Sequence, residues 1–299
     1  MLAGYFSDYF GDELGGPSGP YWIGWIAVGS CTFLGLAEDL RNNYLNPRFR
    51  LYAQLGIFAV TIGVWPLLIP TDFGVPILDG LMRLPLIGWL LSVTFCVGFV
   101  NSINMADGAN GLIAGVITIA FSLFYANTGQ FVYAAMMTAC AVFTIFNVIS
   151  GRLFLGDAGA YGLGSSIVIS SLYLFQENIF STAFLACLFS YPCIDFIMTL
   201  ARRLRAGRSI YLPDNDHLHN RIHYHFQRWL PSKTLANSMT GALIVASSSG
   251  VTLLGYIFQW WPVTSNLWIL LFSLQCVSYG VVFYLTRFGR ANTQYVYRT

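Results

Sequence analysis

In this chain of 299 residues the apolar types make up 56% and the charged types only 9%, whereas soluble domains carry about 25% charged residues. A mean hydropathy of +0.61 excludes a disordered chain, and six cysteines in 299 residues are too few for a disulfide scaffold. Length and composition therefore predict an all-α, polytopic integral membrane helix bundle. The net charge of +2 says little, because the distribution of charge between the two membrane faces matters more than its sum.

Apolar stretches of near-spanning length recur along the whole chain. A helix needs about 20 apolar residues to cross a hydrocarbon core of about 30 Å. Nine stretches approach that length, so we predict about nine transmembrane helices in one membrane domain, residues 1–299. In chain order they cover residues 21–36, 51–69, 84–103, 112–126, 130–149, 161–176, 179–200, 237–258 and 266–285.

The basic residues predict the orientation of these helices. If the chain crosses at every stretch, fourteen of its fifteen Lys and Arg residues lie on one face and only Arg83 lies opposite. Because cytoplasmic loops of membrane proteins carry the excess of Lys and Arg, we expect that face in the cytoplasm. It comprises the segments 37–50, 104–111, 150–160, 201–236 and 286–299.

Two adjacent carboxylates, Glu38 and Asp39, end the first predicted helix on this face, and Arg48 and Arg50 follow. An acidic pair neutralised by arginines is one interpretation, because charged residues are common at helix ends. The other is a functional anionic site, since a carboxylate at that depth seldom occurs without a cation or a water-filled cleft. The pair alone leaves both open.

Residues 101–112, NSINMADGANGL, join two apolar stretches without a basic residue. Asn101 and Asn104 are three residues apart, and so are Asp107 and Asn110, so each pair would share one face of a continuing helix. A simple turn needs one Asn-Gly or Asp-Gly, not four amide or carboxylate side chains. We therefore predict that this segment has a functional role.

Asp157 lies in FLGDAG, residues 154–159, again between small residues at a cytoplasmic helix end. An isolated aspartate there would be interpreted as a helix N-cap. Three separate loops, however, bring carboxylates and Asn oxygens to one membrane face. Such hard oxygen ligands suit Mg²⁺, which keeps several waters and binds substrate phosphates.

The cytoplasmic segment 201–236 contains all four histidines of the chain and six arginines. His217 and His219 form an HxH pattern without a cysteine, and with so many arginines nearby it suits phosphate better than zinc. Arg203 belongs to a basic cluster that would also serve to anchor the topology.

Asp195 lies inside the seventh predicted helix, about two turns before Arg202. A structural ion pair with Arg202 and membership of the cleft on the cytoplasmic face are two interpretations of Asp195, and the sequence leaves both open.

These four stretches, in this order, resemble the polyprenyl-phosphate N-acetylhexosamine-1-phosphate transferases, glycosyltransferase family 4. In that family an Asp pair, an NxxNxxDGxDGL stretch, an FMGDAG turn and a His-bearing loop form the site. The likeness covers residues from about 35 to 221. The motif PxxD at residues 192–195 and the following basic cluster resemble the branch that uses UDP-N-acetylglucosamine, whereas the phospho-N-acetylmuramoyl-pentapeptide branch carries adjacent histidines, a run that Asn220 interrupts here.

The resemblance implies roles for individual residues. Catalytic roles are implied for Glu38, Asp39 and Asp107, with a metal held by Asp157 and Asn104. The remaining candidates would bind substrate; they are Asn101, Asn110, Asp195, Arg203, His217 and His219.

The chain also departs from the family pattern. Glu38 replaces the first Asp of the pair, Asn110 replaces the second Asp of its motif, and Asn215 stands where Arg is common. The family has two further helices before the Asp pair, and this chain has only 37 residues there, so we expect the domain to lack them.

The implied activity is transfer of a sugar 1-phosphate from a UDP-sugar to polyprenyl (undecaprenyl) phosphate, with release of UMP, as a first membrane step in envelope polysaccharide assembly. Mg²⁺, with Mn²⁺ as a substitute, would be the cofactor. The partners would be the UDP-sugar, the lipid phosphate and the bilayer, with a homodimer admissible and no nucleic acid. An inactive or truncated relative is the alternative, and a membrane transporter is a weaker one because only Asp195 approaches the bilayer midplane.

Overall fold

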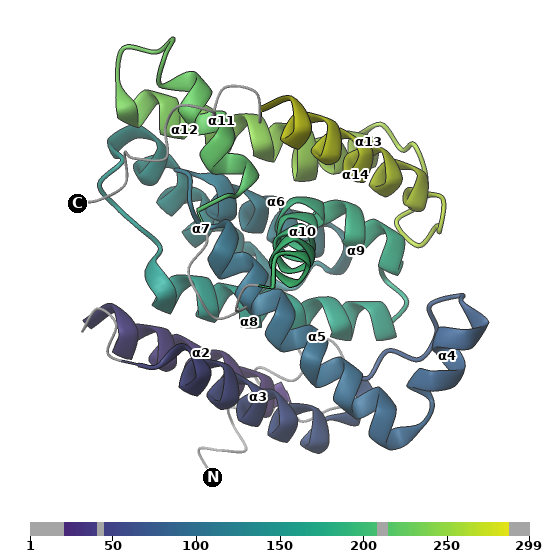
Figure 1. Cartoon of the computed structure of the whole chain (residues 1–299). Coiled ribbons are helices and arrows are strands. Elements are labelled where there is room, and N and C mark those ends of the chain that lie inside the picture. The colour runs from purple at the N-terminus through teal and green to yellow at the C-terminus, as the bar shows by residue number, and fades with distance from the viewer. Residues whose placement is uncertain (1–20, 41–44, 208–214, 287–299) are drawn as a thin grey trace.

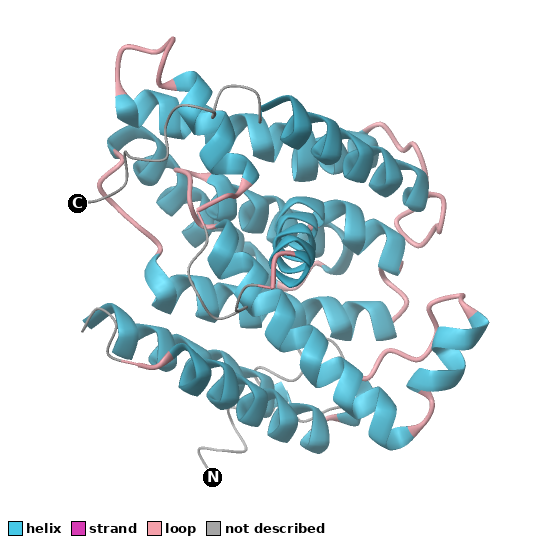
Figure 2. Cartoon of the chain, viewed as in Figure 1, coloured by secondary structure: helices cyan, strands magenta, loops and turns pink. Residues whose placement is uncertain are grey.

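The computed structural model describes residues 21–40, 45–207 and 215–286, and every regular element in these ranges is a helix (Figures 1 and 2). The predicted all-α fold is therefore confirmed for the described residues. The helices are α2 (Tyr21–Leu40), α3 (Pro47–Val64), η1 (Pro66–Leu68), α4 (Pro76–Met82), α5 (Pro85–Ala106), α6 (Leu112–Thr128), α7 (Phe131–Ser150), α8 (Gly156–Gln176), α9 (Thr182–Leu188), α10 (Ser190–Arg205), α11 (Leu218–Phe226), α12 (Lys233–Val245), the π-helical η2 (Ala246–Gly250), α13 (Val251–Ile257) and α14 (Trp268–Leu285).

Local sequence signals account for many of the helix ends. Proline occupies the first turn of α3, α4 and α5, where its missing N–H costs nothing. The side chains of Ser181 and Ser232 accept the backbone N–H of Phe184 and Leu235 at the starts of α9 and α12. Gly151 ends α7 in the left-handed conformation, at φ 59°.

All nine predicted stretches are mainly helical, but fewer have the length and hydropathy of a membrane span. By length and composition, six spans qualify among the described residues, or seven if the bent pair α9 and α10 counts as one. Helix α6 has 17 residues, and α3 includes Arg48, Arg50 and Gln54, which lower its hydropathy. The chain is a multi-pass membrane protein by its helices, with six or seven spans supported rather than nine.

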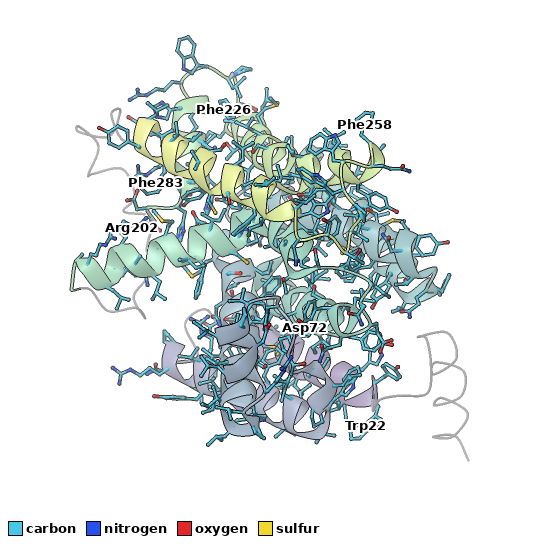
Figure 3. The ribbon with its side chains drawn as sticks, turned by 90° about the vertical axis from the view of Figure 1, so that its right-hand side faces the viewer. Trp22, Asp72, Arg202, Phe226, Phe258 and Phe283 are labelled. Atoms are coloured by element: carbon cyan, nitrogen blue, oxygen red, sulfur yellow. The ribbon has the colours of Figure 1, made fainter. Side chains whose placement is uncertain are left out.

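The seventh predicted span is broken. Helices α9 and α10 meet at Phe189 with a bend of 82°. Helix α10 lies in the centre of the view in Figure 1 and is seen end-on, and it packs against α5 and α14. The bend sends its C-terminal half, with Arg202, outward from one end of the bundle, as Figure 3 shows. Arg203 and Asp195 are carried on this helix.

Among the described helices, α2 and α8 form the most extensive helix pair. Helix α5 packs against α8 as well, and also against α3. As a result the C-terminal ends of α2 and α5 and the N-terminal end of α8 meet at one end of the bundle. Figure 3 shows Arg202, Phe226 and Phe283 toward this end and Trp22 and Phe258 toward the other. The described parts of the predicted cytoplasmic segments therefore lie at a common end; residues 41–44, 208–214 and 287–299 of these segments lie outside the described residues.

The predicted orientation can be tested by cysteine labelling. Trp229, in the turn after α11, is 84% exposed, and Ile77, in α4, is 81% exposed. We expect a membrane-impermeant maleimide to label Trp229→Cys only in inside-out vesicles and Ile77→Cys only in right-side-out cells. The six native cysteines are buried or partly buried in helices, which keeps the background low. The reverse labelling pattern would overturn the topology.

Candidate active site

The carboxylate of Asp39 caps the first turn of α8. Its Oδ1 accepts the backbone N–H of Asp157 at 2.9 Å, and its Oδ2 accepts that of Ala158 at 2.9 Å. Two glycines permit this approach: a Cβ at Gly35 would lie 2.3 Å from the carbonyl oxygen of Asp157, and Gly156 has φ +66° with Asp39 close by. A carboxylate is stabilised at a helix N-terminus by the free N–H groups and the helix dipole.

Arg50 of α3 joins the two neighbouring acidic side chains. Its Nη1 donates to Asp157 Oδ2 at 2.8 Å and lies 3.6 Å from Glu38 Oε1. Glu38 is buried, and its Oε2 accepts the backbone N–H of Leu45 at 2.9 Å. The arginine-neutralised pair that the sequence left open is thus present for Glu38, whereas Asp39 is engaged by backbone donors.

The end of α5 brings a second acidic group to the same place. The Asn104 side chain interacts with the carboxylate of Asp157, and Asp107 is the C-cap residue of α5. Burial, together with the negative charge of Asp157, raises the pKa of Asp107 from its ordinary 3.8 to about 7. The four predicted carboxylates, Glu38, Asp39, Asp107 and Asp157, therefore gather at the junction of α2, α5 and α8.

Asn101 and Asn110 each make a hydrogen bond to another helix. Asn101 Nδ2 donates to Gln54 Oε1 of α3 at 2.6 Å and to the Val97 carbonyl at 2.8 Å. Asn110 is buried and donates to Ser238 Oγ of α12 at 3.2 Å, and it accepts from Asn237 at 3.2 Å. The contacts of Asn101 link α5 to α3, and those of Asn110 hold the loop before α6 against α12.

The histidine segment is attached to α10 through Asp195. His217 Nδ1 lies 2.6 Å from Asp195 Oδ2, while Asp195 Oδ1 accepts from Tyr279 at 2.6 Å and from the backbone of Leu218 at 3.1 Å. Asp195 thus pairs with His217 of the histidine segment, and its membership of the cleft stays a prediction. All three side chains of this network are buried.

His219 connects this network to the Asp107 loop. Its Nδ1 lies 2.9 Å from the Tyr191 hydroxyl, and a Cβ at Gly108 would lie 2.0 Å from its Nε2. Only a residue without a Cβ leaves room for the ring here. Burial lowers the pKa of His219 to about 4, so the ring is neutral at pH 7.

The nearby arginines form a separate charged cluster. Arg221 makes two hydrogen bonds of 2.9 Å to Asp216, and its guanidinium lies 3.6 Å from the centre of the Phe283 ring. Arg202 Nε lies 3.7 Å from Asp216 Oδ2. Arg203 is buried in α10. This cluster places positive charge beside the histidine segment.

The donor set at the α2, α5 and α8 junction fits Mg²⁺. Asp107, Asp157 and the amide of Asn104 carry the hard oxygen atoms that Mg²⁺ prefers, and this cation usually completes its ligands with waters and substrate phosphates. Within residues 21–40, 45–207 and 215–286 no group of three or more His, Cys, Asp or Glu side chains is arranged so that it could hold a metal ion by itself. A cation at this junction would therefore need waters and substrate phosphates for its remaining ligands.

Three contributors were not identified from the sequence as part of the site: Arg50 as the partner of Asp157, and Tyr191 and Tyr279 as partners of the histidine segment. For both tyrosines the available signal was a phenol hydroxyl within an apolar stretch, since a buried tyrosine hydroxyl usually has a hydrogen-bond partner. For Arg50 it was a basic residue one turn into an apolar helix.

The chain resembles known polyprenyl-phosphate transferases in sequence. It is 29% identical over 192 residues to a probable undecaprenyl-phosphate N-acetylglucosaminyl 1-phosphate transferase of Bacillus subtilis, covering 60% of this chain and 53% of that protein. It is 27% identical over 208 residues to the undecaprenyl-phosphate alpha-N-acetylglucosaminyl 1-phosphate transferase of Escherichia coli, covering 65% and 56%.

Relatives of the other branch match as well. The phospho-N-acetylmuramoyl-pentapeptide-transferase of Lactiplantibacillus plantarum is 30% identical over 145 residues, covering 46% of this chain and 43% of that protein. The chain spans about half the length of these relatives.

A profile of the family described as "Glycosyl transferase family 4" matches residues 21–175, the part of the chain that carries Glu38, Asp39, Asn104, Asp107 and Asp157. Because this match covers more than half of the 299 residues, and because the residues it contains form the acidic junction of α2, α5 and α8, the chain belongs to glycosyl transferase family 4.

Proposed function

We propose that this protein transfers N-acetylhexosamine 1-phosphate from a UDP-sugar to polyprenyl phosphate at the cytoplasmic face of the membrane. An oxygen of the lipid phosphate attacks the sugar-bearing phosphorus of the donor. The bond from this phosphorus to the bridging oxygen breaks, and UMP leaves with that oxygen. The observation that carries this proposal is the gathering of four carboxylates from α2, α5 and α8 at one end of an apolar bundle.

Two anionic substrates repel each other, so charge is the main obstacle to the reaction. Asp157 and Asn104, with Asp107 beside them, would hold Mg²⁺, and the bound cation would neutralise the charge that develops on the phosphates. Arg50 and the N-terminus of α8 keep Asp157 and Asp39 in place. We assign Asp39 and Glu38 to orienting the lipid phosphate. Asp39 would act through its contact with the first turn of α8, and Glu38 through Arg50.

Asp107 is the carboxylate best suited to accept a proton, because its pKa of about 7 lies near the working pH. The second pKa of a phosphate monoester is about 6, so the lipid phosphate is already largely a dianion near pH 7. The lipid phosphate therefore needs little more than positioning for its attack. His217, His219 and Arg203 would contact the donor phosphates, while Asp195 and the two asparagines Asn101 and Asn110 support the loops that carry the site.

Release of UMP from membranes that contain the overproduced chain tests the proposal. Each UDP-sugar of a panel that includes UDP-N-acetylglucosamine is supplied with polyprenyl phosphate and Mg²⁺. We expect UMP release that requires the lipid phosphate and stops with EDTA. If no donor supports release while Mg²⁺ still raises the melting temperature of the protein, the inactive-relative alternative replaces this proposal.

The raised pKa of Asp107 has a consequence for stability. The folded protein holds this proton from pH 3.8 up to about pH 7, whereas the unfolded chain loses it near 3.8. The associated stabilisation is complete below pH 3.8 and disappears as the pH rises through 7. In EDTA, raising the pH from 5 to 8 should therefore lower the melting temperature of the wild type more than that of Asp107→Asn.

The measurement is thermal unfolding of both proteins in the same detergent at the two pH values. Mg²⁺ should narrow the difference at pH 8, because the cation favours the ionised carboxyl of the wild type. A difference between the two proteins that stays constant from pH 5 to pH 8 would contradict the raised pKa.

A further inference from the structure

The carboxylate of Asp195 accepts hydrogen bonds from three groups in different elements. Tyr279 comes from α14, Leu218 is the first residue of α11, and His217 precedes it. Asp195 is 1% exposed, so these donors replace water entirely. A buried carboxylate with three donors is matched to its ionised form, which only accepts.

The directions of these bonds determine where the His217 proton lies. The tyrosine hydroxyl and the backbone N–H both donate to Oδ1, which leaves Oδ2 as the acceptor that faces His217 Nδ1 at 2.6 Å. Thr199 Oγ1, the other neighbour of Nδ1, lies farther away, at 3.4 Å. His217 therefore carries a proton on Nδ1, and in the neutral tautomer with this proton Nε2 is the acceptor nitrogen.

His219 has the opposite arrangement. The Tyr191 hydroxyl accepts the backbone N–H of His219 at 3.2 Å, so its own proton is available to His219 Nδ1 at 2.9 Å. With Nδ1 as the acceptor, the proton of a neutral ring lies on Nε2, the nitrogen beside Gly108. The two imidazoles are stacked, with centroids 5.3 Å apart and planes 3° from parallel.

We propose that the stacked rings of His217 and His219 are held in opposite tautomers, one presenting an acceptor and the other a donor. Asp195, supported by Tyr279, keeps the proton of His217 on Nδ1. Tyr191 keeps the proton of His219 on Nε2. Asp195, Tyr279 and Tyr191 are thus positioning residues for His217 and His219. The tautomers themselves are independent of the proposed transferase activity, but their use in positioning the histidines for substrate rests on it.

Nitrogen NMR tests the tautomers directly. The chain contains four histidines, so ¹⁵N-histidine labelling of the full chain in nanodiscs gives four ring spin systems. His217→Gln and His219→Gln assign the two rings of interest. We expect an Nδ1-protonated ring for His217 and an Nε2-protonated ring for His219 in the wild type. A wild-type His217 with its proton on Nε2 would overturn the proposal without any need for a variant.

Asp195→Asn provides the matched perturbation. The amide oxygen of Asn can still accept from Tyr279 and Leu218, but its NH₂ group must then face His217 Nδ1 and donate to it. We expect the His217 proton to move to Nε2, with turnover reduced about 10- to 100-fold, the range for loss of a carboxylate that orients a functional histidine. Tyr279→Phe should leave the tautomer of His217 unchanged, because Oδ2 remains an acceptor.

Measuring the tautomers and the UMP release separately distinguishes failure of the positioning proposal from failure of the transferase proposal. If Asp195→Asn folds but leaves the His217 tautomer unchanged, the positioning role is wrong even when UMP release continues. If no UDP-sugar supports UMP release but the two tautomers are opposite, the arrangement stands and the transferase proposal fails. Circular dichroism and gel filtration of each variant separate both outcomes from unfolding.

Discussion

Asp157→Asn is expected to reduce Mg²⁺-dependent UMP release by about 100- to 1,000-fold, the loss that follows removal of one preorganised charged group at a reacting centre. The substitution removes a negative charge from the junction of α2, α5 and α8, where Asn104 and Arg50 also face this side chain. The isosteric amide keeps the backbone N–H that donates to Asp39, so the cap of α8 is retained.

The control for Asp157→Asn is Asp72→Asn, which makes the same chemical change at an exposed carboxylate on the segment between η1 and α4. We expect the control to retain wild-type UMP release and the same response of melting temperature to Mg²⁺. Asp157→Asn should lose both. Full activity of Asp157→Asn would remove this residue from the metal site, and equal losses in both variants would indicate a general effect of charge.

Gly35→Ala should inactivate the protein and destabilise it. The added Cβ would lie 2.3 Å from the Asp157 carbonyl oxygen and 2.5 Å from the Ala158 nitrogen, and both are backbone atoms that cannot rotate away. Helix α2 must then move off the first turn of α8, which separates Asp39 from the two N–H groups it caps. Overpacking of this kind costs about 1–3 kcal/mol.

Helix α2 supplies its own matched control. A Cβ at Gly29 meets no atom within 4 Å, and the residue lies in the same helix. Gly29→Ala should be neutral or should stabilise the protein by up to about 1 kcal/mol, because alanine restricts the unfolded chain more than glycine does. Thermal unfolding and UMP release of the two variants are compared. A harmless Gly35→Ala would contradict the close packing of α2 against α8.

The acidic site illustrates how far sequence reasoning reached. Glu38, Asp39, Asp107 and Asp157 were predicted to meet because each follows or precedes an apolar stretch on the same predicted face, and the structure brings them to one junction. Their partners could not be read in the same way. Arg50 lies 107 positions from Asp157 in the chain, and only helix packing makes them neighbours.

The number of membrane spans is a feature that the sequence predicted less well than the acidic site. Window hydropathy suggested nine, but it is insensitive to a bend, and the stretch 179–200 is divided at Phe189 by an 82° turn between α9 and α10. That bend also places Asp195 beside the histidine segment, so the break in this predicted span and the contact that the sequence did not indicate share one cause. Neither is encoded in local composition.

Hydropathy and charge depend only on which residues occur and in what order, so the sequence by itself determined that this is a helical membrane protein with an acidic and amide-rich face. The motif order likewise indicated the family that the comparison of residues 21–175 established. Tertiary structure alone decided that Asp39 caps α8, that Arg50 pairs with Asp157, and that Tyr279 and Tyr191 contact Asp195 and His219. A hydrogen bond depends on atoms within about 3 Å, and positions that close are set only when distant helices pack together.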